Sequence, residues 1–69
     1  MRYESNRGTR SLIRNDKERT YVKDYNRSKK VVEFTSNESE ARVFGYIGSA
    51  ANFMDRHHLS SKIYSIWPL

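Results

Sequence analysis

Seven cations and two tyrosines crowd residues 14–30, and this combination suits a surface that binds an anion. These candidate residues are Arg14, Lys17, Arg19, Tyr21, Lys23, Tyr25, Arg27, Lys29 and Lys30. Lysine and arginine neutralise anionic groups such as phosphates, and aromatic rings offer flat faces on which nucleic-acid bases stack. No known RNA- or DNA-binding motif accompanies them, so the same residues also suit a surface that faces a protein or only solvent.

The net charge of the chain is +5, and it is unevenly distributed. Residues 1–32 hold ten Lys or Arg against four Asp or Glu, whereas the remainder has one more acid than base. This asymmetry predicts an anionic partner on the N-terminal side, although charge also keeps small domains in solution. A mimic of DNA is not expected, because mimicry needs net negative charge.

A second candidate surface lies in the apolar run at residues 63–69. In a strand, both faces of this run would be apolar, and a small sheet covered on one side cannot bury both. Tyr64, Trp67 and Leu69 are therefore a candidate protein interface, since Trp and Tyr are favoured at interface hot spots. The alternative is a core strand over which Trp67 folds back.

Residues able to catalyse or to bind metal are present, but their spacing does not fit such a site. His57 and His58 are adjacent, so on a helix they point about 100° apart and share no ligand face. Gly45 and Gly48 precede a helical pattern, yet the lysine and the spacing of a P-loop are missing. We expect no enzyme activity, no catalytic residue, no metal and no cofactor.

Length and composition limit the class of protein. A chain of 69 residues accommodates one domain with a marginal core. The absence of cysteine excludes disulfides and thiolate metal sites and is consistent with a reducing compartment. No apolar stretch has the length of a membrane helix, and residues 1–8 lack the apolar segment of a secretory signal. We expect a cytoplasmic protein that does not bind a membrane.

The expected organisation is a flexible basic arm over residues 1–10 and a single domain over residues 11–69. Strand-forming residues predict two hairpin strands at residues 11–15 and 20–22, and a third strand at residues 30–35. Asparagine, aspartate and serine residues predict the turns between them.

Two short helices are expected in the second half. A capping box of Thr35 with Glu38, or of Asn37 with Glu40, predicts a first helix of about two turns, which the glycines end. Ser49 is the expected cap of a second helix that ends near residue 58. A closing strand over residues 62–67 follows, and a proline ends it.

The fold predicted from these elements is α+β in the order β-β-β-α-α-β. A small antiparallel sheet of three to four strands carries both helices on one face, and the order in which the strands pair is left open. The expected core consists of Ile13, Val22, Val32, Phe34, Ala41, Phe44, Ile47, Ala50, Phe53, Met54, Ile63 and Ile66.

Over residues 11–67 the chain resembles a loose class of very small phage and prophage accessory proteins. The stretches that carry the resemblance are Leu12-Ile13-Arg14-Asn15, Tyr21-Val22-Lys23-Asp24, Phe34-Thr35-Ser36-Asn37, Glu40-Ala41-Arg42-Val43-Phe44 and Ala50-Ala51-Asn52-Phe53. These motifs are strand ends, helix caps and core positions, so they carry over no functional residue.

Small phage proteins of this kind commonly bind host machinery or defence complexes, so the resemblance implies a host-interaction role in a host cell's cytoplasm. We therefore expect a non-enzymatic binding protein that engages a host protein or nucleoprotein complex with an acidic surface, as an inhibitor of host defence would. The alternative is a nucleic-acid-binding module that uses the basic hairpin. A homodimer, and the choice between DNA and RNA, stay open.

Overall fold

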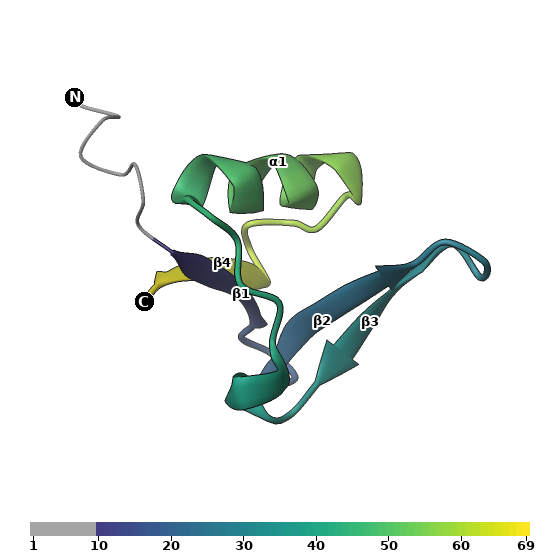
Figure 1. Ribbon diagram of the computed structural model, residues 1–69, viewed down its shortest axis with the longest axis horizontal. Helices are drawn as coiled ribbons and strands as arrows, with labels where there is room; N and C mark the ends of the chain where they lie inside the picture. Colours follow the sequence, from purple (N-terminus) through teal and green to yellow (C-terminus); the bar gives the residue numbers. More distant parts are fainter. Residues whose placement is uncertain (1–9) are drawn as a thin grey trace.

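The structure, a computed structural model, describes residues 10–69, so most of the expected basic arm (residues 1–10) lies outside the described residues. Its elements are β1 (Ser11–Asn15), β2 (Thr20–Asn26), β3 (Val31–Thr35), the 3-10 turn η2 (Glu38–Glu40), α1 (Ile47–Arg56) and β4 (Tyr64–Pro68) (Figure 1). One antiparallel sheet and one helix make an α+β fold, and α1 covers one face of the sheet.

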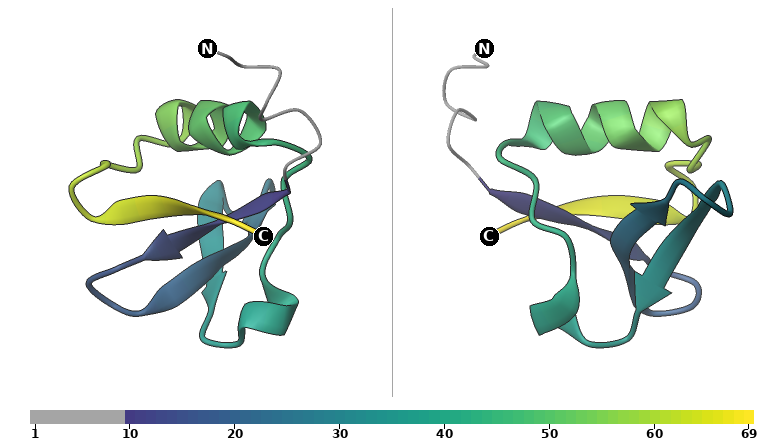
Figure 2. Two further views of the ribbon diagram at one scale, coloured as in Figure 1. Left: turned by 90° about the vertical axis from the view of Figure 1, so that its left-hand side faces the viewer. Right: turned by 45° about the vertical axis from the view of Figure 1, so that its right-hand side comes forward.

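The four strands pair in the order β3-β2-β1-β4, so the first and last strands of the chain lie side by side. β1 pairs with β4 over five residues but with β2 over only two, at Arg14↔Tyr21 and Asn15↔Thr20. Beyond those two pairs β1 and β2 separate, and the β2–β3 hairpin turns steeply away from β1 and β4 (Figure 2).

The backbone after η2 takes up sheet hydrogen bonds on β1 and β2. The amide of Arg42 donates to the carbonyl of Val22 at 2.9 Å, and Phe44 and Ser11 exchange two backbone bonds of 2.7 and 3.1 Å. Residues 42–44 therefore connect β1 with β2 as a short extra piece of sheet.

The prediction of a helix of two turns before the glycines is wrong for this reason. Asn37 does cap a helical start, because its Oδ1 accepts from the Ser39 amide, but only the three residues of η2 follow. Ala41 is already extended, and the next amides bond to strands instead of to the preceding turn. Non-local sheet bonds outweigh the local helical preference here.

The expected second helix is present as α1, but it begins two residues before the predicted cap. Its N-cap is Tyr46, in extended conformation and without a side-chain capping bond, so the prediction of Ser49 as the cap is wrong. The apolar stripe is confirmed, since Ala50, Phe53 and Met54 are buried against the sheet. Among residues 10–69, no helix has both the length and the apolar character needed to cross a membrane.

An irregularity in β2 decides which of its side chains face the helix. The β2–β3 register shifts between Val22, which pairs with Phe34, and Asp24, which pairs with Glu33. Lys23 is the extra residue of a β-bulge, so both Val22 and Tyr25 contact the core. β2 thus runs on through Asn26, past the predicted start of the next turn.

β4 also departs from its predicted limits. It begins at Tyr64 and includes Pro68, which pairs with Ser11, although the sequence predicted that this proline would end the strand. Proline has no amide to donate, but β4 is an edge strand and needs donors on one side only.

The core lies between α1, β1 and β2, with Ile13, Val22 and Ala50 fully buried. Seven of the expected core residues are buried: Ile13, Val22, Ala41, Phe44, Ala50, Phe53 and Met54. Val32, Ile47 and Ile66 are half-buried.

Two expected core residues are exposed, and one buried hydrophobic residue was not expected. Phe34 is 38% exposed and Ile63 37%, so their assignment to the core is wrong. Phe34 belongs to the edge strand β3, which curves away from the helix. Leu12 is only 2% exposed, although its neighbour Ile13 already faces the helix. The chain segment after β3 covers Leu12 from the other side of the sheet.

Candidate partner-binding groove

The structure does not bring the nine predicted hairpin residues onto one surface. Lys17 and Arg19 lie in the turn before β2, whereas Arg27, Lys29 and Lys30 lie in the turn after it. A seven-residue strand separates the two groups by roughly 20 Å. The side chains of both turns are exposed, as is Lys23 at the bulge. The basic region therefore consists of separate patches.

Arg14 and Tyr21 are cross-strand partners on the face of the sheet opposite α1. The Nη1 of Arg14 lies 2.9 Å from Asp16 Oδ1, and its Cζ lies 5.2 Å from the centre of the Trp67 ring. Trp67 Nε1 donates to Ser65 Oγ, which in turn donates to Asp16 Oδ1, at 2.8 and 3.0 Å. The charge of Arg14 and one face of Trp67 are thus engaged within the protein.

Tyr25 lies on the opposite face, within a row of stacked rings. Its ring is 4.4 Å from that of His57, which is also 4.4 Å from Phe53. Burial, reinforced by the charges of nearby Arg56 and other cations, lowers the pKa of His57 below the ordinary value of 6.5. His57 is half-buried beside the core residue Phe53, and His58 is exposed.

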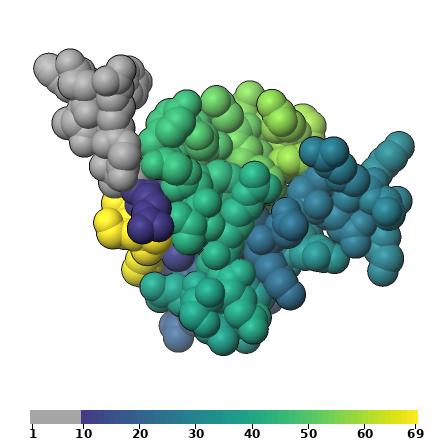
Figure 3. All heavy atoms as spheres, in the orientation of Figure 1, coloured from purple at the N-terminus to yellow at the C-terminus, as the bar shows by residue number. Residues whose placement is uncertain are grey.

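A groove of about 460 Å³ opens where the β2–β3 hairpin meets the C-terminal end of α1. Figure 3 shows the hairpin projecting beside this end of the helix. Aromatic and apolar side chains form its walls: Tyr25, Val31, Val32, Phe34, Leu59 and Tyr64. Lys30 and Arg56 supply its positive charge, and His57 and His58 also line it. No Asp or Glu lines the groove, so its charge and its apolar walls together suit an anionic, partly apolar occupant.

Two of these basic residues occupy a backbone conformation that favours glycine. Lys30 has φ 56° and His58 has φ 58°, and the only other non-glycine residue with positive φ among residues 10–69 is Arg19. The left-handed region costs a residue with a side chain roughly 1 kcal/mol. Glycine would avoid this cost at both turn positions.

Replacing Lys30 by glycine is expected to stabilise the fold by about 0.5–1 kcal/mol, because glycine adopts positive φ without strain. Urea unfolding followed by far-UV circular dichroism measures the change. Lys29→Gly is the matched control. It removes the same charge from the same turn, but Lys29 does not have a positive φ. A Lys30→Gly protein less stable than the Lys29→Gly protein would show that the positive φ of Lys30 does not strain the fold.

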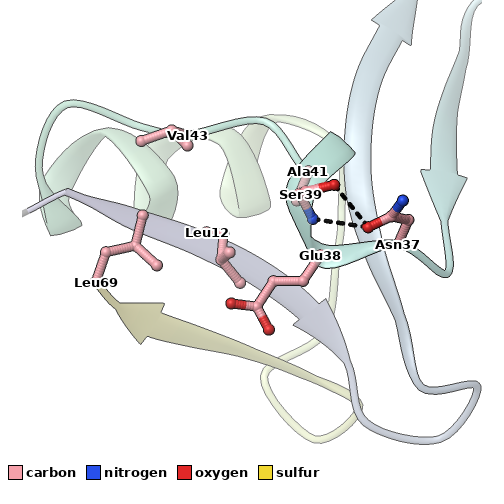
Figure 4. A pocket seen from close by; sticks show the side chains of 7 residues that line it. All are labelled: Leu12, Asn37, Glu38, Ser39, Ala41, Val43 and Leu69. Carbon is pink, nitrogen blue, oxygen red and sulfur yellow. Dashed lines mark hydrogen bonds between the residues drawn. The ribbon is translucent and has the colours of Figure 1, made fainter.

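A second hollow, of about 530 Å³, lies between β1, η2 and the end of the chain. Figure 4 shows Leu12, Ala41, Val43 and Leu69 around it, with the carboxylate of Glu38 as its one charged group. Its polar lining residues, Asn37, Glu38 and Ser39, are consecutive in the chain, and the amide and Oγ of Ser39 donate to Asn37 Oδ1 at 3.0 and 2.8 Å.

The three residues of the predicted protein interface are separated by the fold. Tyr64 lines the groove, Trp67 lies over Arg14 on the other face of the sheet, and Leu69 borders the second hollow. Trp67 and Leu69 are 46% and 62% exposed, so neither side chain folds back over the core.

Sequence reasoning overlooked the groove residues that come from distant parts of the chain. Arg56 is the last residue of α1, His58 lies in the turn after it, and Phe34 was assigned to the core. One sequence signal does point to the turns, because Asn15 and Asn26 each precede a basic left-handed residue by four positions. The Oδ1 of each asparagine accepts amide bonds of 2.9–3.0 Å within its own turn.

Searches with this chain find no matching protein-family model, no matching curated protein and no matching solved structure. Within residues 10–69, no three His, Asp or Glu side chains gather closely enough to hold a metal ion. The chemistry of its own surfaces is therefore the guide to what the protein binds.

Proposed function

We propose that this chain is a small non-enzymatic binding protein of phage or mobile-element type. It attaches through the groove beside β3 to a host protein or nucleoprotein complex with an acidic surface, and it acts as an inhibitor by occluding that surface. The observation that carries this proposal is the groove itself, with aromatic and apolar walls, a basic border and no acidic lining residue. The phage origin and the inhibitor role rest on the sequence resemblance alone.

The ring geometry favours a protein over the bases of a nucleic acid. Bases bind single-strand-binding surfaces by stacking on open aromatic faces. In the groove the rings already stack on one another, Tyr25 on His57 at 4.4 Å and Phe34 on Tyr64 at 6.1 Å. Apolar side chains of a protein can fill the remaining space between such rings without an open face.

Direct nucleic-acid binding is the second candidate, and one observation favours it. The turn between β2 and β3 projects from the molecule with three exposed cations, Arg27, Lys29 and Lys30, and no acid among them. Such a turn can contact phosphates without reading bases.

A pair of binding measurements separates the two functions. Fluorescence anisotropy with duplex and single-stranded DNA and RNA is expected to show weak binding that disappears as salt approaches physiological strength. Affinity capture with the tagged chain from nuclease-treated bacterial lysate is expected to retain a stoichiometric protein partner at that salt. Tight nucleic-acid binding that persists at this salt, without a nuclease-resistant protein complex, would overturn the proposal in favour of the alternative.

A further inference from the structure

The groove lies beside β3, and β3 has one unpaired edge. Within residues 10–69, β3 pairs only with β2, because it is the outermost strand of the sheet. Val31, Val32 and Phe34 of this strand line the groove. A chain placed against the outer edge of β3 would therefore lie along the mouth of the groove.

We propose that the partner contributes an extended acidic segment that adds to β3 as a fifth strand. This inference rests on the proposed function. The backbone of the segment pairs with the outer edge of β3, its alternate apolar side chains enter the groove, and its carboxylates meet Lys30 and Arg56. This mode of recognition takes affinity from main-chain bonds and specificity from pockets for alternate side chains.

The edge strand β3 contains no proline and no lysine, two residues by which proteins commonly prevent strand addition. β3 reads Val-Val-Glu-Phe-Thr, and its single charged residue, Glu33, accepts a bond from Asn26 at 3.1 Å. Val31 and Phe34 are 48% and 38% exposed, so apolar surface lies open beside unpaired backbone.

The positive charge of the groove favours an added strand that carries acidic side chains. The two cations of the groove come from elements far apart in sequence, Lys30 from the β2–β3 turn and Arg56 from α1. Lys30 also occupies a left-handed conformation that glycine would adopt more readily. Because no acidic residue lines the groove, a strand with carboxylates is favoured there and a basic strand is repelled.

Selection of peptides from a random linear library on the immobilised full chain, at near-physiological salt, tests this assignment. The expected consensus has apolar residues at alternate positions and acidic residues at further positions of that same face, because only this face of an added strand meets the groove with Lys30 and Arg56. Amide chemical shifts of the protein are expected to move along Val31–Thr35 when a selected peptide is added. Methylation of the peptide backbone nitrogens at alternate residues should abolish binding in one register and spare it in the other, because only alternate amides face β3.

Two matched variants test whether the peptide binds at the groove. Lys30→Glu is expected to weaken the selected peptide about tenfold, whereas Lys17→Glu, at the far end of β2, leaves its affinity unchanged. A basic or proline-rich consensus, equal effects of the two variants, or equal tolerance of both methylation registers would overturn the fifth strand. So would self-association of the chain through β3 in sedimentation velocity.

The outcomes also separate this inference from the proposed function. If a captured partner binds at near-physiological salt but neither its peptides nor the selected ones shift β3 amides, only the fifth strand fails. If the chain binds nucleic acid alone, both fail.

Discussion

Reversal of two charges, Lys30→Glu with Arg56→Glu, is expected to weaken binding of the captured protein partner about tenfold. The two changes replace the two cations that line the groove by anions that repel an acidic surface. Exposed ion pairs contribute about 0.2–1 kcal/mol each, and the switch to repulsion adds a similar amount for each residue. Titration of the purified partner by isothermal calorimetry measures the loss.

The matched control is the double variant Arg10→Glu with Lys17→Glu, which has the same net charge but alters exposed residues outside the groove. It is expected to bind the partner almost as the parent chain does. Arg56 occupies the last turn of α1, where a cation interacts favourably with the helix dipole, so circular dichroism must confirm that both variants fold. Equal losses in the two doubles would show that net charge alone, and not the groove, governs binding.

Truncation of Phe53 to alanine is expected to lower the free energy of unfolding by about 3–4 kcal/mol. Phe53 is 9% exposed, its ring meets Phe44 edge-on at 5.3 Å, and His57 lies tilted against it. The guanidinium of Arg42 also lies 5.5 Å from this ring. A domain of this length has about 5 kcal/mol of stability in total, so the variant should be close to unfolding at room temperature.

Urea unfolding followed by Trp67 fluorescence and by far-UV circular dichroism measures this loss. Phe53→Leu should cost about 1 kcal/mol, because it keeps most of the buried volume. Asn52→Ala, at an exposed neighbouring position of α1, should change stability by only a few tenths of a kcal/mol. A Phe53→Ala chain that unfolds at nearly the parent's urea concentration would show that the core does not depend on this ring.

The aromatic row explains why the core and the groove are not independent. Phe53 contacts His57, His57 stacks on Tyr25, and Tyr25 lines the groove. One wall of the groove is therefore the outer surface of the core. We expect core variants to loosen the groove, so binding measurements on them must be made below the onset of unfolding.

Local patterns in the sequence determined the elements that depend on near neighbours. The strand composition of β1 and β3, and the stripe of Ala50, Phe53 and Met54, predicted elements that exist because a strand repeats every two residues and a helix every 3.6. Asn37 likewise marked a helical start in the right place. The cations of the basic turns were recognised as candidates for the same reason, since they lie close together in sequence.

Tertiary structure alone decided the features that join distant residues. The amides of Arg42 and Phe44 bond to β2 and β1 instead of extending η2, and that choice depends on strands more than 19 residues earlier in the chain. The groove unites Lys30 with Arg56 because α1 packs across the sheet, and the bulge at Lys23 turns Tyr25 toward that helix. Sequence periodicity describes which face of an element is apolar, whereas packing decides which faces meet and which edge of the sheet is left unpaired.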